Sequence, residues 1–273
     1  MSSPVASPGG AAAAGWYKHP AAQQLGWAIA GISILVVLWT LFGYYIAGNP
    51  KTQSFASFGF IPTMQAFPEL WELGKLQSAV MVSTYRLGAG LAIAVAIGVP
   101  VGILMGRVKR FRELSNSPFQ LLRMVSPLSW MPIAVYVYAT WDGAIIFLIA
   151  MAAVWPVMFQ TAAGLSKVDP AWFKVARNLG ASSTQMLTRI IIPAITFDVL
   201  SGIRLALGVA WIVLVPAEYL GVTSGLGYAI QDARGTLSYH WLTAMVMTIG
   251  AIGYCLDSIL VLLIKRFSWH RGG

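Results

Sequence analysis

The sequence predicts an all-α membrane protein with about six transmembrane helices. Of its 273 residues, 58% are hydrophobic and only 10% are charged, whereas a soluble domain carries about 25% charged residues. Its mean hydropathy is +0.71. Apolar runs of roughly 20 residues, the length that crosses a bilayer core, recur along the chain. Soluble packing could not bury this much apolar surface, so the bilayer must act as the solvent.

Six apolar runs are expected to span the membrane. They cover residues 24–47, 76–106, 118–139, 143–165, 190–220 and 241–264. The second and fifth exceed the length that the core requires, so we expect them to tilt or to project into water. Prolines interrupt four of the six, at Pro100, Pro127, Pro132, Pro156 and Pro216. Membrane helices tolerate such breaks where neighbours or a cavity satisfy the freed backbone groups, which fits a moving bundle better than a static anchor.

The remaining segments complete the expected domain organisation. Residues 1–20, rich in Ser, Ala, Gly and Pro, are expected to form a disordered tail. They do not resemble a cleavable signal peptide, because the apolar run that follows Lys18 and His19 is too long. Residues 21–75 are expected to hold the first span and an outer loop. Residues 76–265 should form the core domain, with a cytoplasmic loop at 166–189, and residues 266–273 a second tail.

The distribution of lysine and arginine orients the spans. If the N-terminus is cytoplasmic, twelve of the 18 basic residues fall in inner segments and three in outer ones. Inner loops of membrane proteins carry this excess. We therefore expect both termini to be cytoplasmic and a multi-pass protein of the bacterial plasma (inner) membrane, in contact with lipid. The net charge of +9 then reflects topology, and nucleic-acid binding is not expected.

An amphipathic segment, DPAWFKVARNLGASSTQMLTRIIIP (169–193), separates the fourth and fifth spans. Asp169 and Pro170 predict a helix start, because the first can cap and the second needs no N–H partner. Gly180 predicts the left-handed residue that ends this helix. Ser182 or Ser183 can then cap a second helix, which enters the membrane.

The first of these short helices has the composition of a docking element. Trp172, Phe173, Ala176 and Leu179 fall on or near one face, and large aromatic groups need a partner when they lie at a water interface. We predict that Trp172, Phe173 and Ala176 insert into a groove on a partner protein.

Motifs for catalysis and metal binding are absent from the sequence. It contains no GxxxxGK[ST] loop for nucleotide phosphates, no HExxH and no GxSxG. No Cys or His pairs have metal-ligand spacing, and a single Cys255 excludes a disulfide framework. We predict a chain that is not an enzyme, with no catalytic residues, metal or resident cofactor.

Charged residues within the spans suggest a path for a solute. Charge at membrane depth is costly unless it is paired or hydrated. Five residues of the fifth span are three or four positions apart and so share one helix face: Arg204, Gly208, Trp211, Val215 and Glu218. One hypothesis is a hydrated path that favours an anion; its candidate residues are Arg86, Arg123, Trp130, Arg204, Trp211 and Glu218. The alternative is that Arg204 satisfies carbonyls of a neighbouring helix, Glu218 sits at the outer interface and the tryptophans fill the core.

The chain resembles the permeases of binding-protein-dependent ABC importers. Their signature is EAA, three residues, G, nine residues, I, one residue and LP. Five residues fall on this spacing: Ala176, Gly180, Ile190, Ile192 and Pro193. The chain departs from the signature at three positions, where Lys174 replaces Glu, Val175 replaces the first Ala and Ile192 replaces Leu. Four stretches look like the branch of these permeases that handles nitrate, sulfonate, taurine and bicarbonate: 83–106, 121–133, 202–221 and 224–234. Within the second of them, the sequence SPLSWMP looks most like the members of the branch that act in nitrate transport.

This resemblance implies a type I ABC importer permease in which the motif helix of the 166–189 loop is the coupling helix. Its expected partners are a second permease copy, usually identical, two cytoplasmic ATPase subunits that hold ATP and Mg²⁺, and an extracytoplasmic solute-binding protein. The implied coupling residues are Trp172, Phe173, Lys174, Ala176, Arg177, Gly180 and Pro193. The implied function is transport of a small anion. Two alternatives remain: a secondary transporter driven by an ion gradient, and a membrane scaffold that transports nothing.

Overall fold

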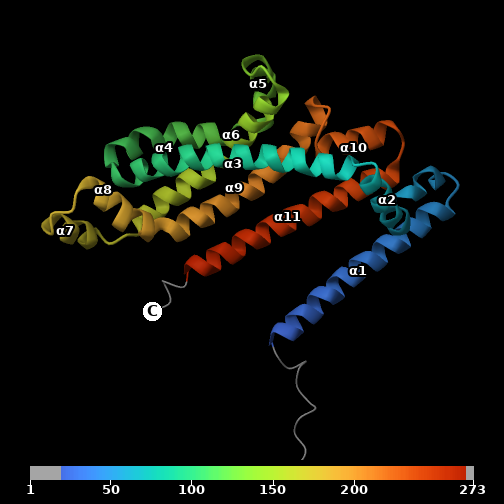
Figure 1. Ribbon diagram of the computed structural model, residues 1–273, viewed down its shortest axis with the longest axis horizontal. Coiled ribbons are helices and arrows are strands. Elements are labelled where there is room, and N and C mark those ends of the chain that lie inside the picture. Colours follow the sequence, from blue (N-terminus) through green and yellow to red (C-terminus); the bar gives the residue numbers. More distant parts are fainter. Residues whose placement is uncertain (1–19, 269–273) are drawn as a thin grey trace, which may run out of the picture. The chain divides into compact units, whose positions relative to one another are not determined.

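The structure is a computed structural model that describes residues 20–268, almost all of them helical (Figure 1). The chain divides into two compact units at residues 65 and 66, and this boundary falls inside helix α2 (Phe60–Glu72). Most of the two tails expected at residues 1–20 and 266–273 lies outside the described residues. The last helix continues through Ser268, so the first residues of the tail expected at 266–273 are helical.

The first unit contains α1 (Pro20–Gly48), η2 (Gln53–Phe58) and the beginning of α2. Trp39 Nε1 donates a hydrogen bond of 2.8 Å to the Phe58 carbonyl, which fixes η2 against α1. The expected outer loop is thus largely helical. A sequence reading based on long apolar runs passes over such short amphipathic helices.

The second unit carries the remaining helices. They are α3 (Lys75–Arg107), α4 (Lys109–Met124), η3 (Pro127–Trp130), α5 (Met131–Val137), α6 (Trp141–Ser166), α7 (Pro170–Asn178), α8 (Ser183–Gln185), η4 (Met186–Ile191), α9 (Ile192–Gly221), α10 (Leu226–Gly235) and α11 (Tyr239–Ser268). Four of them, with α8 and η4 continuous with α9, are long and apolar enough to cross a membrane, as is α1.

The third predicted span, 118–139, is wrong as a single helix. The chain there forms the end of α4, an extended break at Val125 and Ser126, and then η3 and α5. Pro127 explains the break, because its ring forces the preceding residue out of the helical region; Ser126 has ψ 128°. The longest helical piece between Pro127 and Val137 is too short to cross a bilayer by itself.

Helices α3 and α6 nevertheless run in the same direction, so the chain between them must return across the bundle. A Cβ added to Gly90 would collide with Ile149, one at Gly98 with Val157, and one at Gly102 with Thr161. The contacts advance together along both helices. Parallel neighbours need a crossover connection, and residues 108–140 provide it. The pass predicted at 118–139 is therefore made in two pieces.

Helix α9 runs antiparallel to α6, and α11 runs antiparallel to α9. Gly164 of α6 approaches Asp198 near the start of α9, whereas Gly221 at the end of α9 approaches Trp141 at the start of α6. Figure 1 shows α7 at one end of α9 and α10 at the other. We refer to these as the α7 end and the α10 end.

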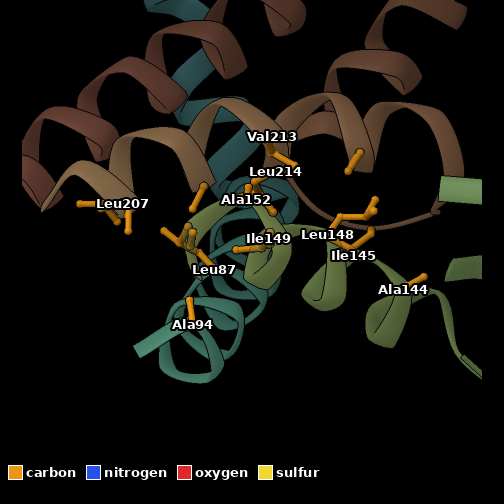
Figure 2. Packing of buried hydrophobic residues seen from close by; sticks show 14 of the residues in the cluster. Leu87, Ala94, Ala144, Ile145, Leu148, Ile149, Ala152, Leu207, Val213 and Leu214 are labelled. Carbon is orange, nitrogen blue, oxygen red and sulfur yellow. The ribbon is translucent and has the colours of Figure 1, made fainter. Parts of the chain in front are cut away.

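The main core lies between α3, α6 and α9. Figure 2 shows Leu87 of α3, Ile149 of α6 and Leu214 of α9 converging on it. Alanines and glycines fill the closest contacts, so the helix backbones approach one another as small residues allow in membrane bundles.

Candidate functional site

The amphipathic segment folds locally as its capping residues predict. The Asp169 carboxylate accepts a hydrogen bond of 2.8 Å from the Ala171 N–H, and Pro170 occupies the first helical turn of α7. Gly180 ends α7 with φ +75°. Ser182 and Gln185 then form a capping box that starts the next helix.

A π-helical turn, η4, joins this start to α9. Pro193 lies two residues after the end of η4 and lacks the N–H that would bond to the carbonyl four residues earlier. The wider turn accommodates that loss. Such π-turns occur often at functional positions, and nothing in the sequence reading anticipated this one.

The exposed face of α7 differs in part from the predicted one. Trp172 is exposed, as expected, but Ala176 is buried and Phe173 is half-buried against the chain's own core. The other large apolar side chains exposed here are Val175 and Leu179. They follow Trp172 by three and seven residues and so form one stripe along α7. We call Trp172, Val175 and Leu179 the α7 stripe; Lys174 and Arg177 are exposed beside it.

At the α10 end, Arg86 of α3 lies at the centre of a buried polar network. It is 1% exposed. Its Nη1 donates to Glu218 Oε1 (2.7 Å) and to the Ser224 carbonyl (2.9 Å). Nε and Nη2 donate to Asp142 Oδ1, at 2.8 and 2.5 Å, and Nη2 also donates to Ser224 Oγ (2.8 Å). All five guanidinium N–H groups are therefore used within the chain.

Glu218 of α9, which is completely buried, ties the same network to α10. Its carboxylate accepts hydrogen bonds from the Ser83 hydroxyl (2.8 and 2.9 Å) and from the Gly227 N–H (3.0 Å). Gly225 has φ +101°, and a Cβ there would overlap the Glu218 carboxylate. The connection between α9 and α10 thus needs glycine both for its backbone conformation and for its close approach.

Two cavities border this network. One, of about 220 Å³, is lined by Arg86, Asp142 and residues 221–224. The other, of about 470 Å³, lies between Trp141 and the α10 residues Tyr228 and Asp232. Arg234, also on α10, donates to Tyr219 Oη (2.6 Å), and this hydrogen bond raises the pKa of Arg234.

At the α7 end, a second buried carboxylate joins α6 to α9. Asp198 is 3% exposed and accepts a hydrogen bond of 2.8 Å from Lys167 Nζ, at the end of α6. The ion pair closes the base of the loop that carries α7. The sequence reading did not single out Asp198, although an acidic residue inside an apolar run is a visible signal.

Arg204 of α9 lies apart from both networks. Its Nε and Nη2 donate to Asp257 Oδ1 and Oδ2 of α11, at 2.7 and 2.8 Å. The two side chains are 45% and 46% exposed. The alternative in which Arg204 binds carbonyls of a neighbouring helix is therefore wrong, because its partner is a carboxylate.

The structure separates the six predicted path residues. Glu218 and Arg86 form the buried network, so Glu218 is not exposed, although it lies three residues from the end of α9 at the α10 end. Trp211 packs against Gly253 of α11. Trp130 is half-buried against the main core, and the Arg123 guanidinium lies 5.4 Å from the Phe159 ring centroid. Only Arg204 combines charge, mid-helix position and exposure.

A sequence model of the family described as binding-protein-dependent transport system inner membrane component matches residues 98–269. This is more than half of the chain and includes α7, Gly180 and the α9–α10 connection. The chain belongs to this family. As a permease of this family it is a multi-pass membrane protein, and the resemblance seen in its sequence is confirmed.

The permease is similar to proteins with named solutes. It is 31% identical to the bicarbonate transport system permease CmpB of Synechococcus elongatus, with 86% of each chain covered. It is 30% identical to the taurine transport system permease TauC of Escherichia coli, with 93% of each chain covered.

Its fold is similar to that of a chain from the MetNI methionine ABC transporter in inward-facing conformations. The TM-score is 0.62 at 16% sequence identity, over 74% of the permease and 98% of the other chain. This likeness concerns the fold, and it confirms the predicted all-α fold of an ABC importer permease.

Proposed function

We propose that the chain is the membrane permease of an ATP-driven importer and that α7 transmits the state of a separate ATPase to the bundle. The α7 stripe is the observation that carries the proposal. It presents three large apolar side chains on a firmly capped helix that projects from the α7 end. Exposed apolar patches rimmed by charge mark protein contact sites. The neighbouring Lys174 and Arg177 suit a partner surface with acidic groups.

The α7 end faces the cytoplasm in this proposal. Helices α3, α6 and α11 all run toward that end. It therefore carries Arg107 at the end of α3, Lys167 after α6 and Lys265 near the end of α11. Basic residues concentrate on the cytoplasmic side of membrane proteins. The partners would be two ATPase subunits that bind ATP and Mg²⁺, a second permease copy and an extracytoplasmic solute-binding protein.

The solute class in this proposal is a small anion of the nitrate, bicarbonate or sulfonate type, such as taurine. Its support comes from the named solutes of the relatives and from the cationic Arg204 at mid-depth. The ion-gradient and scaffold alternatives receive no comparable support, since neither accounts for a capped apolar helix at the base of the bundle.

Co-purification tests the central step. A tagged chain carrying Leu179→Asp, which places a charge in the stripe, should lose its ATPase subunit while the permease still enters the membrane. Leu237→Asp is the matched control, because Leu237 is similarly exposed but follows α10 at the opposite end. Full retention of the ATPase by the Leu179→Asp chain would remove α7 as the contact.

A further inference from the structure

Arg86 of α3 and Arg204 of α9 have opposite environments. Arg86 is buried and uses all five of its N–H groups within the chain. Arg204 is about half exposed, and the hydrogen bonds that it makes in the described part of the chain use two of the five. Arg204 therefore offers three N–H donors on the outside of the bundle.

Neither Arg204 nor Asp257 can face lipid in this state. Arg204 is the thirteenth of 30 residues in α9, and Asp257 is the nineteenth of 30 in α11. At 1.5 Å per residue each lies roughly 15–30 Å from both ends of its helix, near the middle of a membrane. Charged groups at that depth face protein or water-filled cavities. Water supplies the three open donors most directly, and the exposure of both side chains leaves room for it.

We propose that Arg204 and Asp257 line the aqueous path of the transporter and that the transported anion binds Arg204 in competition with Asp257. This inference rests on the proposed function. An arginine fork matches the oxygens of a small oxyanion as it matches those of a carboxylate. Asp257 occupies the fork when the path is empty. The anion engages the open donors and partly displaces Asp257, and the returning carboxylate then favours release.

Neighbouring positions on α9 support a path along this face. Gly208 lies one turn beyond Arg204, is exposed, and has no atom within 4 Å of an added Cβ. A small residue there leaves space beside the guanidinium. It also makes Gly208 suitable for a cysteine probe that disturbs no contact.

The first test measures water and charge at Gly208→Cys in the assembled transporter, with Cys255→Ala as background because Cys255 is exposed on α11. Anionic and cationic methanethiosulfonate reagents are compared. We expect reaction with both, faster with the anionic reagent, and a fall of that preference when Arg204→Gln is added. Val209→Cys is the matched control, since Val209 is exposed but lies about 140° around the helix from Arg204. No reaction at position 208 means that a second copy of the chain covers the face, and the proposal fails.

The second test measures protection of the same cysteine by nitrate, bicarbonate and taurine, with choline as the cationic control. We expect protection by at least one anion and none by choline. Asp257→Asn should lower the concentration for half-protection by about twofold to fivefold, the range for one half-exposed ion pair, and Arg204→Gln should abolish protection. An unchanged half-protection concentration in both variants overturns the competition between anion and Asp257.

The outcome is independent of the ATPase contact. The cysteine chemistry requires no ATP hydrolysis, so failure of the proposed coupling function would appear as wild-type chains without ATP-dependent uptake. Failure of the present inference would appear as wild-type uptake that Arg204→Gln and Asp257→Asn leave intact.

Discussion

Arg86 and Glu218 form an ion pair in which the two side chains are 1% and 0% exposed, with 2.7 Å between Nη1 and Oε1. The pair joins α3 to α9, and the glycine-containing connection to α10 closes over it. A buried pair of this kind gives little net stability over apolar packing, but loss of one partner leaves a buried charge. We therefore expect the pair to contribute more to which helices meet than to net stability.

Removing either charge should destabilise the second unit. We expect Glu218→Gln and Arg86→Gln each to cost about 3–5 kcal/mol, as for other broken buried pairs. Asp142→Asn should cost less, because the Asp142 side chain is 55% exposed and solvent can replace its interaction. Unfolding of the purified permease in mixed micelles, followed by tryptophan fluorescence, gives these values. Equal losses for the three variants would contradict the assigned ranking.

The close approach of α3 and α6 should depend on Gly102. An added Cβ would lie 2.5 Å from the Met158 carbonyl oxygen and 2.7 Å from Thr161 Cβ. We expect Gly102→Ala to lower the melting temperature, because two backbones would have to separate. Gly88→Ala, on the exposed face of the same helix with nothing within 4 Å, should leave it unchanged or raise it slightly. The comparison is a thermal melt of the two variants side by side.

The corner after α7 should require glycine for a purely conformational reason. Gly180 has φ +75°, and no atom lies within 4 Å of an added Cβ. Gly180→Val would therefore strain the backbone by about 1–2 kcal/mol without a clash. We expect an assembled chain whose solute-stimulated ATP hydrolysis falls severalfold. The control is Gly235→Val, at the end of α10, where the space is equally open and φ is not positive. Normal stimulation by the Gly180→Val complex would count against a coupling role.

Orientation can be read with single cysteines in the Cys255→Ala background. Gly235→Cys, at the last residue of α10, should react with an impermeant maleimide added to intact cells. Ser183→Cys, next to α7, should react only after the membrane is opened. Both positions are exposed, so accessibility within the fold does not bias the result. Labelling of position 183 from outside would invert the proposed topology.

Local signals in the sequence predicted local structure well. Asp169, Pro170 and Gly180 act on residues within one helical turn of themselves, so the boundaries of α7 could be read from their chemistry alone. Pro127 also acts locally, because it keeps Ser126 out of the helical conformation and so separates α4 from η3. The prediction of one continuous span there nevertheless gave more weight to the apolar run than to the proline.

Contacts between helices could not be predicted in the same way. Arg86 and Arg204 look alike in the sequence, each within an apolar run, yet one is buried with Glu218 and the other is exposed with Asp257. Which residue faces which depends on the rotation and depth of two helices at once, and a single helix face does not determine either. Asp198 and Asp257 were visible as acidic residues in apolar runs, but their partners were not.

The parallel arrangement of α3 and α6 has a consequence for how the protein is made. The two helices can pair only after residues 108–140 have crossed back, because both enter from the same side of the membrane. That returning segment is the least apolar pass, with Lys109, Arg110 and Arg112 at its start and a break at Ser126. The core between α3 and α6 can therefore form only after this returning segment and α6 have both entered the membrane.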